Sequence, residues 1–244
     1  MAQKLENLSL KHLNNTIYLL LHHYIVEKFG QFGKPTIKHQ LIISESARKI
    51  VLNKPDKILF HPDIQKIRPV QKPVDFRCRS IHDSPSSDTL LPLTYIKDVV
   101  KRKLIGSQLA PGTTKNRGQA LEEKIASSLG YTLQPGDLLA GGYPDLRHQA
   151  LEIKVQDSPT VDLGMYSPEF EEDIPLCEGF KTTTIRYFLA FTDPATNVIE
   201  GGVLCPGQYL GQHFTYVGEK SYNCQRAIPM SFFDDLSGTA VFNP

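Results

Sequence analysis

The sequence predicts an α/β (α+β) protein in which a mixed central β-sheet is flanked by helices, with a helical region at the N-terminus. Apolar and polar residues alternate over 151–155, which is typical of a half-buried strand. Residues 182–192 are rich in β-branched and aromatic side chains, as in a central strand, and 198–204 and 212–217 are further strand candidates. Apolar side chains at helical spacing over 115–130 predict a helix, and a sheet covered by helices defines this fold class.

The N-terminal part of the chain is expected to be mainly helical. A first helix is predicted from Leu5 to Phe29, and a short second helix starts after Ser44 or Ser46, both of which suit an N-cap. The composition then shifts to Pro, Asp, Ser and basic residues over 60–92, which predicts a loop-rich connection. Another helix is expected from Tyr95 to Leu104.

These elements divide the chain into a mainly helical N-terminal region at 1–104 and a core at 105–244 whose C-terminal part is rich in β-structure. Hydrophobic residues make up 40% of the chain and charged residues 22%, which is ordinary for a globular protein with a buried core. Neither a signal peptide nor an apolar span of about 18 residues is evident, so we expect a cytoplasmic protein with no membrane partner.

Charge and cysteine content narrow the functional classes. The net charge of +1 is not the signature of a non-specific nucleic-acid coat, but it allows a basic groove that is balanced by acids elsewhere. The four cysteines are far apart with no Cys-x-x-Cys pair, so reduced thiols are expected rather than a zinc site or a disulfide framework. The motifs of hydrolase triads, phosphate loops and dinucleotide-binding folds are absent from the sequence.

The most informative stretch of the chain ends in the triplet Glu152-Ile153-Lys154. Pro144-Asp145 lies seven residues ahead of this triplet. Glu152 and Lys154 are two residues apart on the predicted strand, so their side chains project from the same face. A turn at 147–149 would bring Asp145 back beside them. Two carboxylates and an ammonium group are therefore expected to converge on one point.

This convergence predicts a divalent-metal phosphodiesterase site. Mg²⁺ prefers oxygen ligands, usually one or two carboxylates together with waters and substrate phosphate. Asp145, Glu152 and the carbonyl of Ile153 are expected to hold the metal, which would polarise the phosphate and activate a water. Lys154 would stabilise the developing charge or orient the attacking water. A surface hairpin with solvated charges is the alternative that the motif by itself leaves open.

The helix expected ahead of the motif supplies a third carboxylate. Leu121, Ile125 and Leu129 lie at helical spacing, and Glu122 lies on or beside their face. A carboxylate that leans towards a core is costly unless it is paired or binds a metal. We therefore expect Glu122 to support the metal, and the alternative is an ordinary solvent-facing glutamate.

In this order, Glu122 on a helix, Pro144-Asp145, and Glu152 and Lys154 on a strand resemble the PD-(D/E)XK nuclease superfamily, which includes most type II restriction endonucleases. The resemblance implies a restriction-endonuclease-like core and a Mg²⁺-dependent enzyme that cleaves double-stranded DNA at specific sites. It also implies a homodimer, because two-fold DNA sites match two-fold proteins. A cognate DNA methyltransferase in the same system would be a further partner.

A narrower resemblance covers residues 116–169. This segment is similar to the strand-nicking mismatch-repair endonuclease MutH and its restriction-enzyme relatives, in which a Glu-x-Lys triplet is likewise followed by a proline and a polar stretch. Here extra residues separate Lys154 from Pro159. A MutH-like nicking enzyme activated by a partner protein is therefore one alternative function. A DNA-binding module that keeps the fold without catalysis is another.

DNA binding needs basic and polar side chains near this motif. Phosphate contacts set affinity, and base contacts set specificity. The beginning of a helix also favours phosphate through its backbone N–H groups. For Lys101, Arg102 and Lys103, the alternative is that they form a solvated basic face of a helix. The residues expected to contact DNA are Lys101, Arg102, Lys103, Lys115, Asn116, Arg117, Arg147 and His148. Further loop residues that could read bases are Lys181, Arg186, Gln225 and Arg226.

Overall fold

The computed structural model of the chain describes residues 8–13, 16–21, 36–68, 75–110, 114–134, 136–140, 142–217 and 221–223. The chain divides into two compact units. The first unit comprises residues 1–37 and 221–244, and the second comprises residues 38–220. The predicted mixture of helices and sheets is confirmed, and the residues of the proposed motif all lie in the second unit.

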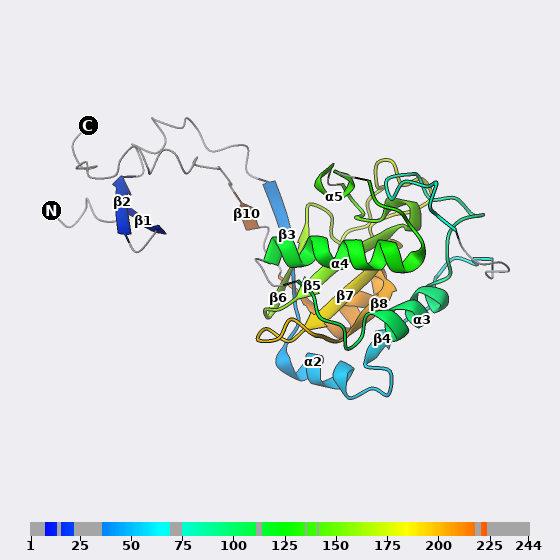
Figure 1. The fold of residues 1–244 in the computed structure, drawn as a ribbon, viewed down its shortest axis with the longest axis horizontal. Helices are drawn as coiled ribbons and strands as arrows, with labels where there is room; N and C mark the ends of the chain where they lie inside the picture. The colour runs from blue at the N-terminus through cyan, green and yellow to red at the C-terminus, as the bar shows by residue number, and fades with distance from the viewer. Residues whose placement is uncertain are drawn as a thin grey trace. The chain divides into compact units, whose positions relative to one another are not determined.

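The first unit contains strands where a helix was expected. β1 (Leu8–Leu13) and β2 (Thr16–Leu21) pair as an antiparallel hairpin (Figure 1), and β10 is a short strand at Ser221–Asn223. The prediction of a helix from Leu5 to Phe29 is therefore wrong. The segment Leu-Ser-Leu-Lys at the start of β1 alternates apolar and polar residues, and this period of two fits a strand.

The second unit is built around a four-stranded mixed sheet in the order β4-β8-β7-β5. Its strands are β4 (Ile58–Phe60), β5 (Leu151–Gln156), β7 (Arg186–Thr192) and β8 (Ile199–Pro206). β5 runs parallel to β7 and β4 parallel to β8, whereas β7 and β8 are antiparallel. Every residue of β7 is buried, so the expected central strand is confirmed from its arginine onward. β5, which carries the Glu-x-Lys triplet, is an edge strand.

The second unit also contains most of a smaller antiparallel sheet. Its strands β3 (Thr36–Ile42) and β6 (Thr160–Gly164) pair with each other, and β3 also pairs with β9 (Thr215–Tyr216). The strand expected at 198–204 is β8. The strand expected at 212–217 is reduced to β9, because the short helix α6 (Leu210–His213) occupies its beginning.

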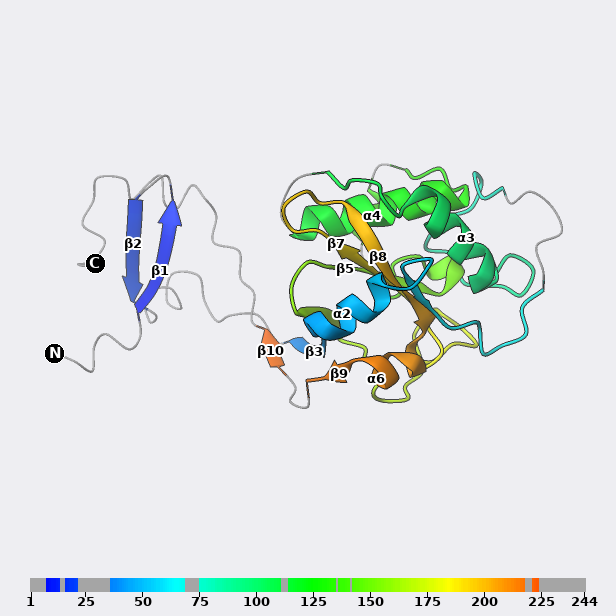
Figure 2. The same ribbon diagram turned by 90° about the horizontal axis from the view of Figure 1, so that it is seen from below.

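Helices cover both faces of the main sheet, as Figure 2 shows. α3 (Leu93–Lys103) and α4 (Thr114–Leu129) lie on one side, and α2 (Glu45–Leu52) lies on the other. α5 (Asp137–Ala140) follows α4, and η2 (Arg147–Gln149) and η3 (Gly207–Tyr209) are single 3₁₀ turns. These helices confirm the three expected between residues 44 and 130.

Local signals explain where these helices begin and end. The Ser44 hydroxyl accepts a hydrogen bond of 3.2 Å from the backbone N–H of Ala47, so Ser44 is the N-cap of α2. Gly130 follows α4 at a φ of +98°, a left-handed conformation that glycine adopts without strain and that stops the helix. Residues 61–68 and 75–92 form no helix or strand apart from one bridge at Phe76, which confirms the loop-rich connection for the described part.

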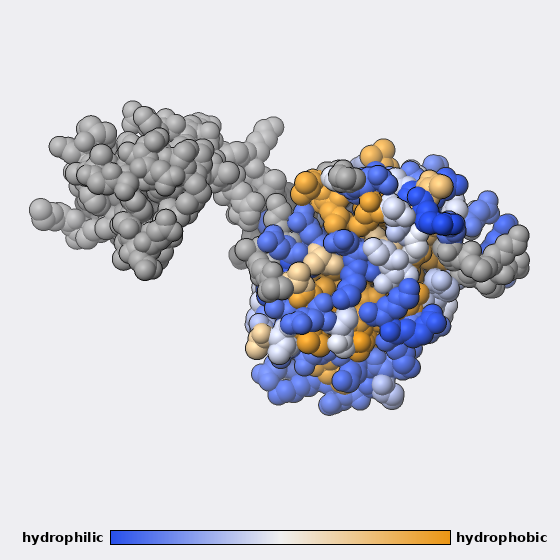
Figure 3. Space-filling view, viewed as in Figure 1, coloured by the Kyte–Doolittle hydropathy of each residue, from blue (hydrophilic) through white to orange (hydrophobic). Residues whose placement is uncertain are grey.

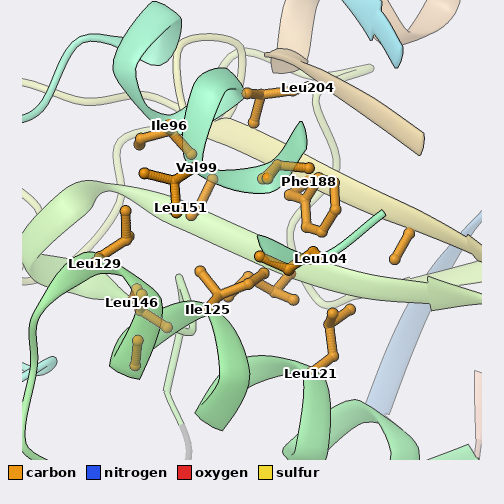
Figure 4. Close-up of a cluster of buried hydrophobic side chains, with 14 of the residues drawn as sticks. Ile96, Val99, Leu104, Leu121, Ile125, Leu129, Leu146, Leu151, Phe188 and Leu204 are labelled. Carbon is orange, nitrogen blue, oxygen red and sulfur yellow. The ribbon is translucent and has the colours of Figure 1, made fainter. Parts of the chain in front are cut away.

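Two hydrophobic cores pack against the two faces of the main sheet. Side chains from α3, α4 and β5 form the first core (Figure 4), in which Leu121, Ile125 and Phe188 are at most 1% exposed. Burial of each such side chain contributes about 1.5–3 kcal/mol to folding. The second core contains side chains from α2, β3 and the opposite faces of β7 and β8, because successive residues of a strand point to opposite faces.

The two cores join parts of the chain that were expected to be separate. α2, α3 and β4 precede residue 104, and they share these cores with β5, β7 and β8. The boundary expected after residue 104 therefore does not coincide with the division into compact units. In the described part of the chain, no helix has both the length and the apolar character that a membrane span requires.

Candidate active site

The chain reverses direction just before β5. η2 forms a single turn, Ala150 follows it with a left-handed φ of +47°, and Leu146 forms an isolated antiparallel bridge with Leu151. The expected turn at 147–149 is confirmed. Asp145 lies in the approach to this turn and not on a regular strand, since the pairing there is limited to that single bridge.

A buried polar network holds this turn in place. His148 is 2% exposed, and its two ring nitrogens lie 2.8 Å from the Thr89 hydroxyl and 2.7 Å from the Tyr131 hydroxyl. Gln149 is completely buried, accepts a hydrogen bond of 2.9 Å from the Leu91 N–H and donates one of 3.0 Å to Tyr131. Burial also lowers the pKa of His148. The prediction that His148 contacts DNA is therefore wrong, because its ring is buried and both ring nitrogens are hydrogen-bonded within the protein.

The turn brings together the three motif side chains. Glu152 is 2% exposed, and one of its carboxylate oxygens forms a 2.5 Å ion pair with the Lys154 ammonium. The other oxygen accepts a 3.0 Å hydrogen bond from the Asp145 N–H, and the Asp145 carboxylate accepts one of 2.8 Å from the Ile153 N–H. The predicted convergence of two carboxylates and an ammonium group is confirmed.

The same contacts fix the direction of the Ile153 carbonyl. The Ile153 N–H bonds to Asp145 on the open edge of β5, away from β7. The N–H and C=O of one strand residue point to the same side. The carbonyl of Ile153 therefore points to the open edge, on the same side as the Asp145 carboxylate. β5 itself is buried on both faces at Glu152 and Ile153, and it is not the half-buried strand that the alternation predicted.

Glu122 reaches the same point from α4. It is half-buried whereas Glu123 is exposed, so the choice between the two glutamates is confirmed. Burial raises the pKa of Glu122 to about 7, and the negative charge of Asp145 adds to this rise. Burial and then Asp145 likewise raise the pKa of Glu152. Burial alone would lower the pKa of Lys154, but the carboxylates of Glu152 and Asp145 outweigh it and raise that pKa.

These shifts describe a cluster of negative charge that a cation would stabilise. Three carboxylates repel one another in a partly desolvated site, and Lys154 compensates only part of that charge. Among the residues that the structure describes, no three or more His, Cys, Asp or Glu side chains gather as a metal-holding group. Mg²⁺, however, is commonly held by one or two carboxylates with waters and phosphate. Asp145 and Glu122, with the Ile153 carbonyl, fit that donor set. Glu152 was also expected to hold the metal, but its two oxygens are engaged by the Lys154 ammonium and the Asp145 N–H.

Two clefts meet at this cluster, and both are lined by Asp145 and Lys154. The first, here called the α4 cleft, has a volume of about 560 Å³ and lies between α4, β5 and β6, with Glu122 in its wall. The second, here called the Tyr166 cleft, has a volume of about 430 Å³ and contains Tyr166 and Arg147. The acidic cluster is therefore open to a large substrate on two sides.

The residues at the start of α4 differ in their surroundings. Arg117 forms an ion pair with Asp157 and a 2.9 Å hydrogen bond with Asn197, so it ties α4 to the loops at the end of the sheet. Asn116 is exposed and lines a third cleft, between α4 and α5. Lys115 lies in the first turn of α4, and its side chain is outside the described part of the structure. Figure 3 shows that this face of the second unit is mainly hydrophilic with interspersed apolar residues.

The basic residues of α3 lie away from the clefts. Lys101 forms an ion pair with Asp56, which precedes β4 at the edge of the sheet opposite to β5. The Arg102 side chain donates a 3.1 Å hydrogen bond to a carbonyl of its own helix. The Lys103 ammonium bonds at 3.3 Å to the carbonyl of Ser128, at the far end of α4. None of the three lines either cleft, so the prediction that they act beside the site is not supported by their placement.

The further base-reading candidates are also placed elsewhere or lie outside the described residues. Arg186 is 1% exposed and forms a 2.9 Å ion pair with Asp63, so it supports the core and cannot read bases. Lys181 forms an ion pair with Glu171 on the surface. Gln225-Arg226 lies outside the described part of the chain.

Two tyrosines at the site were not identified from the sequence. The Tyr143 hydroxyl lies 2.6 Å from the hydroxyl of Tyr187 on β7, and the Tyr143 ring stacks on the ring of Tyr166 with centroids 4.7 Å apart. Tyr143 directly precedes Pro144 of the motif, so its position beside the site could have been predicted from the sequence. Tyr166 offered none, because its position depends on how the segment after β6 folds back.

The site thus combines Asp145, Glu152, Lys154 and Glu122 at the edge of the main sheet, with Arg147 in an adjoining cleft. The arrangement is open on two sides, and its excess of carboxylates suits a divalent cation. No protein-family model, curated protein or solved structure matches the chain.

Proposed function

We propose that this protein is a Mg²⁺-dependent endonuclease that hydrolyses phosphodiester bonds of double-stranded DNA at specific sites, in the manner of a type II restriction endonuclease. The observation that carries the proposal is the contact set around β5. Glu152 is bonded to both Lys154 and the Asp145 backbone, and the Asp145 carboxylate is bonded to Ile153. This brings the acidic and basic groups of the motif to one point beside two open clefts.

The order of elements supports the same proposal for the fold. α4 with Glu122, the turn with Asp145, and β5 with Glu152 follow one another along the chain and meet in space. This is the order that the PD-(D/E)XK resemblance implies, so we propose a restriction-endonuclease-like core for the second unit. A homodimer belongs to this proposal, because two-fold symmetry matches cleavage of both strands at a symmetric site. A cognate DNA methyltransferase belongs to it too, because the cell's own copies of the target site would need protection.

Each side chain has a distinct part in the proposed reaction. Asp145, Glu122 and the Ile153 carbonyl would hold Mg²⁺, which supplies charge stabilisation at the phosphate and a more acidic water. Lys154 stays protonated because its pKa is raised, so it places a positive charge where negative charge develops on the phosphate. Glu152 positions that ammonium through the ion pair, and the buried turn holds both carboxylates in register.

The proposal is tested by incubating the purified chain with supercoiled plasmid and with phage DNA, in Mg²⁺ and in EDTA. We expect discrete linear fragments in Mg²⁺ only. Asp145→Ala and Lys154→Ala should each lower the cleavage rate at least about a hundredfold, as for other losses of transition-state charge stabilisation. Lys101→Ala is the matched control, because this lysine is paired with Asp56 away from both clefts.

The same experiment separates the alternatives. Nicked circles without linear product would favour a MutH-like strand-nicking enzyme over a type II restriction enzyme. Retained DNA binding with no cleavage of methylated or unmethylated DNA would favour a binding module. Cleavage that survives in Asp145→Ala and Lys154→Ala would overturn the assignment of the site.

A further inference from the structure

The Tyr166 cleft has an aromatic and apolar wall that phosphodiester hydrolysis does not require. The rings of Tyr143 and Tyr166 are stacked with an interplanar angle of 25°. Met165 and Leu176 also line the cleft and are 60% and 69% exposed, which is unusual for large apolar side chains gathered in one place. A second apolar or aromatic surface placed against this wall would remove it from water.

The backbone at Leu176 is strained. Its φ is +62°, in the left-handed region that a bulky L-residue rarely adopts. Such conformations cost about 1–3 kcal/mol and persist where the surrounding structure or the function requires them. Here the conformation belongs to a turn that is closed by a 3.2 Å hydrogen bond from the Cys177 N–H to the Ile174 carbonyl, and this turn holds Leu176 in the wall of the cleft.

Arg147 adds a positive charge to the same cleft. One of its terminal nitrogens donates a 3.1 Å hydrogen bond to the His82 carbonyl, and its Nε is buried without a hydrogen-bond partner. No carboxylate of the described residues lies within ion-pair distance of this guanidinium group. The guanidinium group therefore carries an uncompensated positive charge in the cleft wall, and phosphate is a group that guanidinium binds well.

The size and position of the cleft limit what it can hold. Its volume of about 430 Å³ lies within the range of small-ligand sites, roughly 300–1,000 Å³. Asp145 and Lys154 form part of its wall as well as of the α4 cleft. An occupant of this cleft is therefore adjacent to the phosphate that the proposed function places at these residues.

We propose that the Tyr166 cleft receives one nucleoside next to the scissile phosphate, unstacked from the duplex, with its base against Tyr166, Met165 and Leu176 and an adjoining phosphate on Arg147. This inference rests on the proposed endonuclease function. An aromatic ring and apolar side chains around a cavity are what proteins use to hold a base that has left the stack. Lys154 in the same wall is paired with Glu152, so Arg147 is the cation left to bind the adjoining phosphate.

The test uses the fact that the chain contains no tryptophan. Tyr166→Trp introduces one indole into the cleft, and stacking of a base on that ring should quench its fluorescence. The probe is a single-stranded hexathymidylate, whose bases are free to stack on protein, with Ca²⁺ in place of Mg²⁺. Ile50→Trp is the matched control, because Ile50 is 66% exposed on α2, away from the clefts. We expect saturable quenching with Tyr166→Trp and none with Ile50→Trp.

A second set of variants measures the size of the effect. Leu176→Ser in the Tyr166→Trp protein should weaken binding of the hexathymidylate about tenfold, as loss of one stacking or apolar partner does. Arg147→Gln in the same protein should weaken it by a similar factor and lower its dependence on salt. With duplex DNA, Tyr166→Phe should retain cleavage and Tyr166→Ala should lower it about tenfold or more. Leu176→Ser replaces an exposed side chain, so its result stands even if Tyr166→Ala fails to fold.

The outcomes for this inference and for the proposed function are distinguishable. Quenching that persists in Asp145→Ala, without any cleavage by the unmodified chain, would support the nucleoside cleft and remove the endonuclease. Mg²⁺-dependent cleavage that Tyr166→Ala and Leu176→Ser leave unchanged, with no quenching in Tyr166→Trp, would overturn the nucleoside cleft and leave the endonuclease intact.

Discussion

Glu122 and Glu123 are adjacent glutamates on α4 with different environments. Glu122 is half-buried beside Asp145 and lines the α4 cleft, whereas Glu123 is exposed. We predict that Glu122→Gln lowers the rate of DNA cleavage about 10- to 100-fold, a usual range for groups that support a metal site. Glu123→Gln should leave the rate within a factor of about two, because it keeps the same helix and changes only a solvated carboxylate. Plasmid-cleavage kinetics at saturating Mg²⁺ would measure both, and equal effects would contradict the role of Glu122.

The raised pKa of Glu122 predicts how metal affinity depends on pH. Its pKa of about 7 means that the carboxyl group is largely protonated at pH 6 and largely ionised at pH 8. A proton and a metal ion compete for the same oxygens, so affinity for Mn²⁺ should rise as pH increases through 7. Isothermal titration calorimetry at pH 6, 7 and 8 would measure this. Glu122→Gln should flatten the dependence, and an affinity that falls with rising pH would contradict it.

At the scale of elements, the η2 turn determines how far apart the two motif carboxylates lie. Gln149 is completely buried, and its amide satisfies the Leu91 N–H and the Tyr131 hydroxyl. We predict that Gln149→Leu lowers the free energy of unfolding by about 1–3 kcal/mol, because buried polar groups lose their partners. Urea unfolding would measure the change. Cleavage should fall too, since displacement of the turn moves Asp145 relative to Glu152.

The alternative is that the buried hydrogen bonds of Gln149 stabilise the protein but do not affect the geometry of the site. In that case Gln149→Leu would lower the unfolding free energy but leave the cleavage rate per folded molecule unchanged. A rate measured well below the unfolding midpoint separates the two views, and Lys103→Ala, a surface change on α3, serves as the control.

The basic cluster at the end of α3 leads to a different prediction. Lys101 is held by Asp56, and Lys103 bonds to Ser128 at the far end of α4. We predict that replacing Lys101, Arg102 and Lys103 together by alanine leaves DNA affinity and the slope of log affinity against log salt unchanged. Each lost phosphate contact would lower that slope by about one. Fluorescence anisotropy across a salt series would measure the affinity and the slope. A slope smaller by about three would show that these three residues contact DNA phosphates.

At the scale of the whole molecule, the second unit should be stabilised by divalent cations. Without metal, the native state retains a proton on Glu122 between its ordinary pKa of 4.5 and about 7, and the unfolded chain releases it. Metal-free stability therefore falls as pH rises through this range. Ca²⁺ at about 100 times its dissociation constant should restore about 2.7 kcal/mol at pH 8. Differential scanning calorimetry should show a rise in Tm of about 5–10 °C at pH 8 and a smaller one at pH 6.

Asp145→Ala provides the control for this shift. It removes a carboxylate from the proposed metal site, and Asp145 belongs to neither hydrophobic core. Its Tm should not respond to Ca²⁺. A shift of equal size in this variant would mean that the cation binds elsewhere on the chain.

Much of the second unit was predictable because its signals are local. The apolar spacing that predicts α4, the alternation that predicts β5 and the β-branched run that predicts β7 each lie within a few turns or pleats of chain. The same local order placed Glu152 and Lys154 on one face and the turn at 147–149 before them. These elements form because the spacing of their apolar side chains matches the repeat of the helix or strand backbone.

Other features depended on contacts between distant parts of the chain. β1 and β2 are strands although Leu5 to Phe29 was expected to be helical, because the apolar spacing there suits both periods and pairing decides between them. His148 is bonded to Thr89, 59 residues earlier, and is buried even though basic turn residues are usually solvated. Lys101 and Arg147 were grouped by sequence, yet they lie at opposite edges of the sheet.

The amino-acid order alone determined the helix, turn and strand that carry Glu122, Asp145, Glu152 and Lys154, since each follows from short-range periodicity. Only the tertiary structure decided which neighbours complete the site. The packing of β5 as an edge strand leaves the Asp145 side open and forms the Tyr166 cleft from residues up to 34 positions apart, from Gly142 to Leu176. Such a cleft depends on how the whole unit closes around the sheet, and no local pattern encodes that closure.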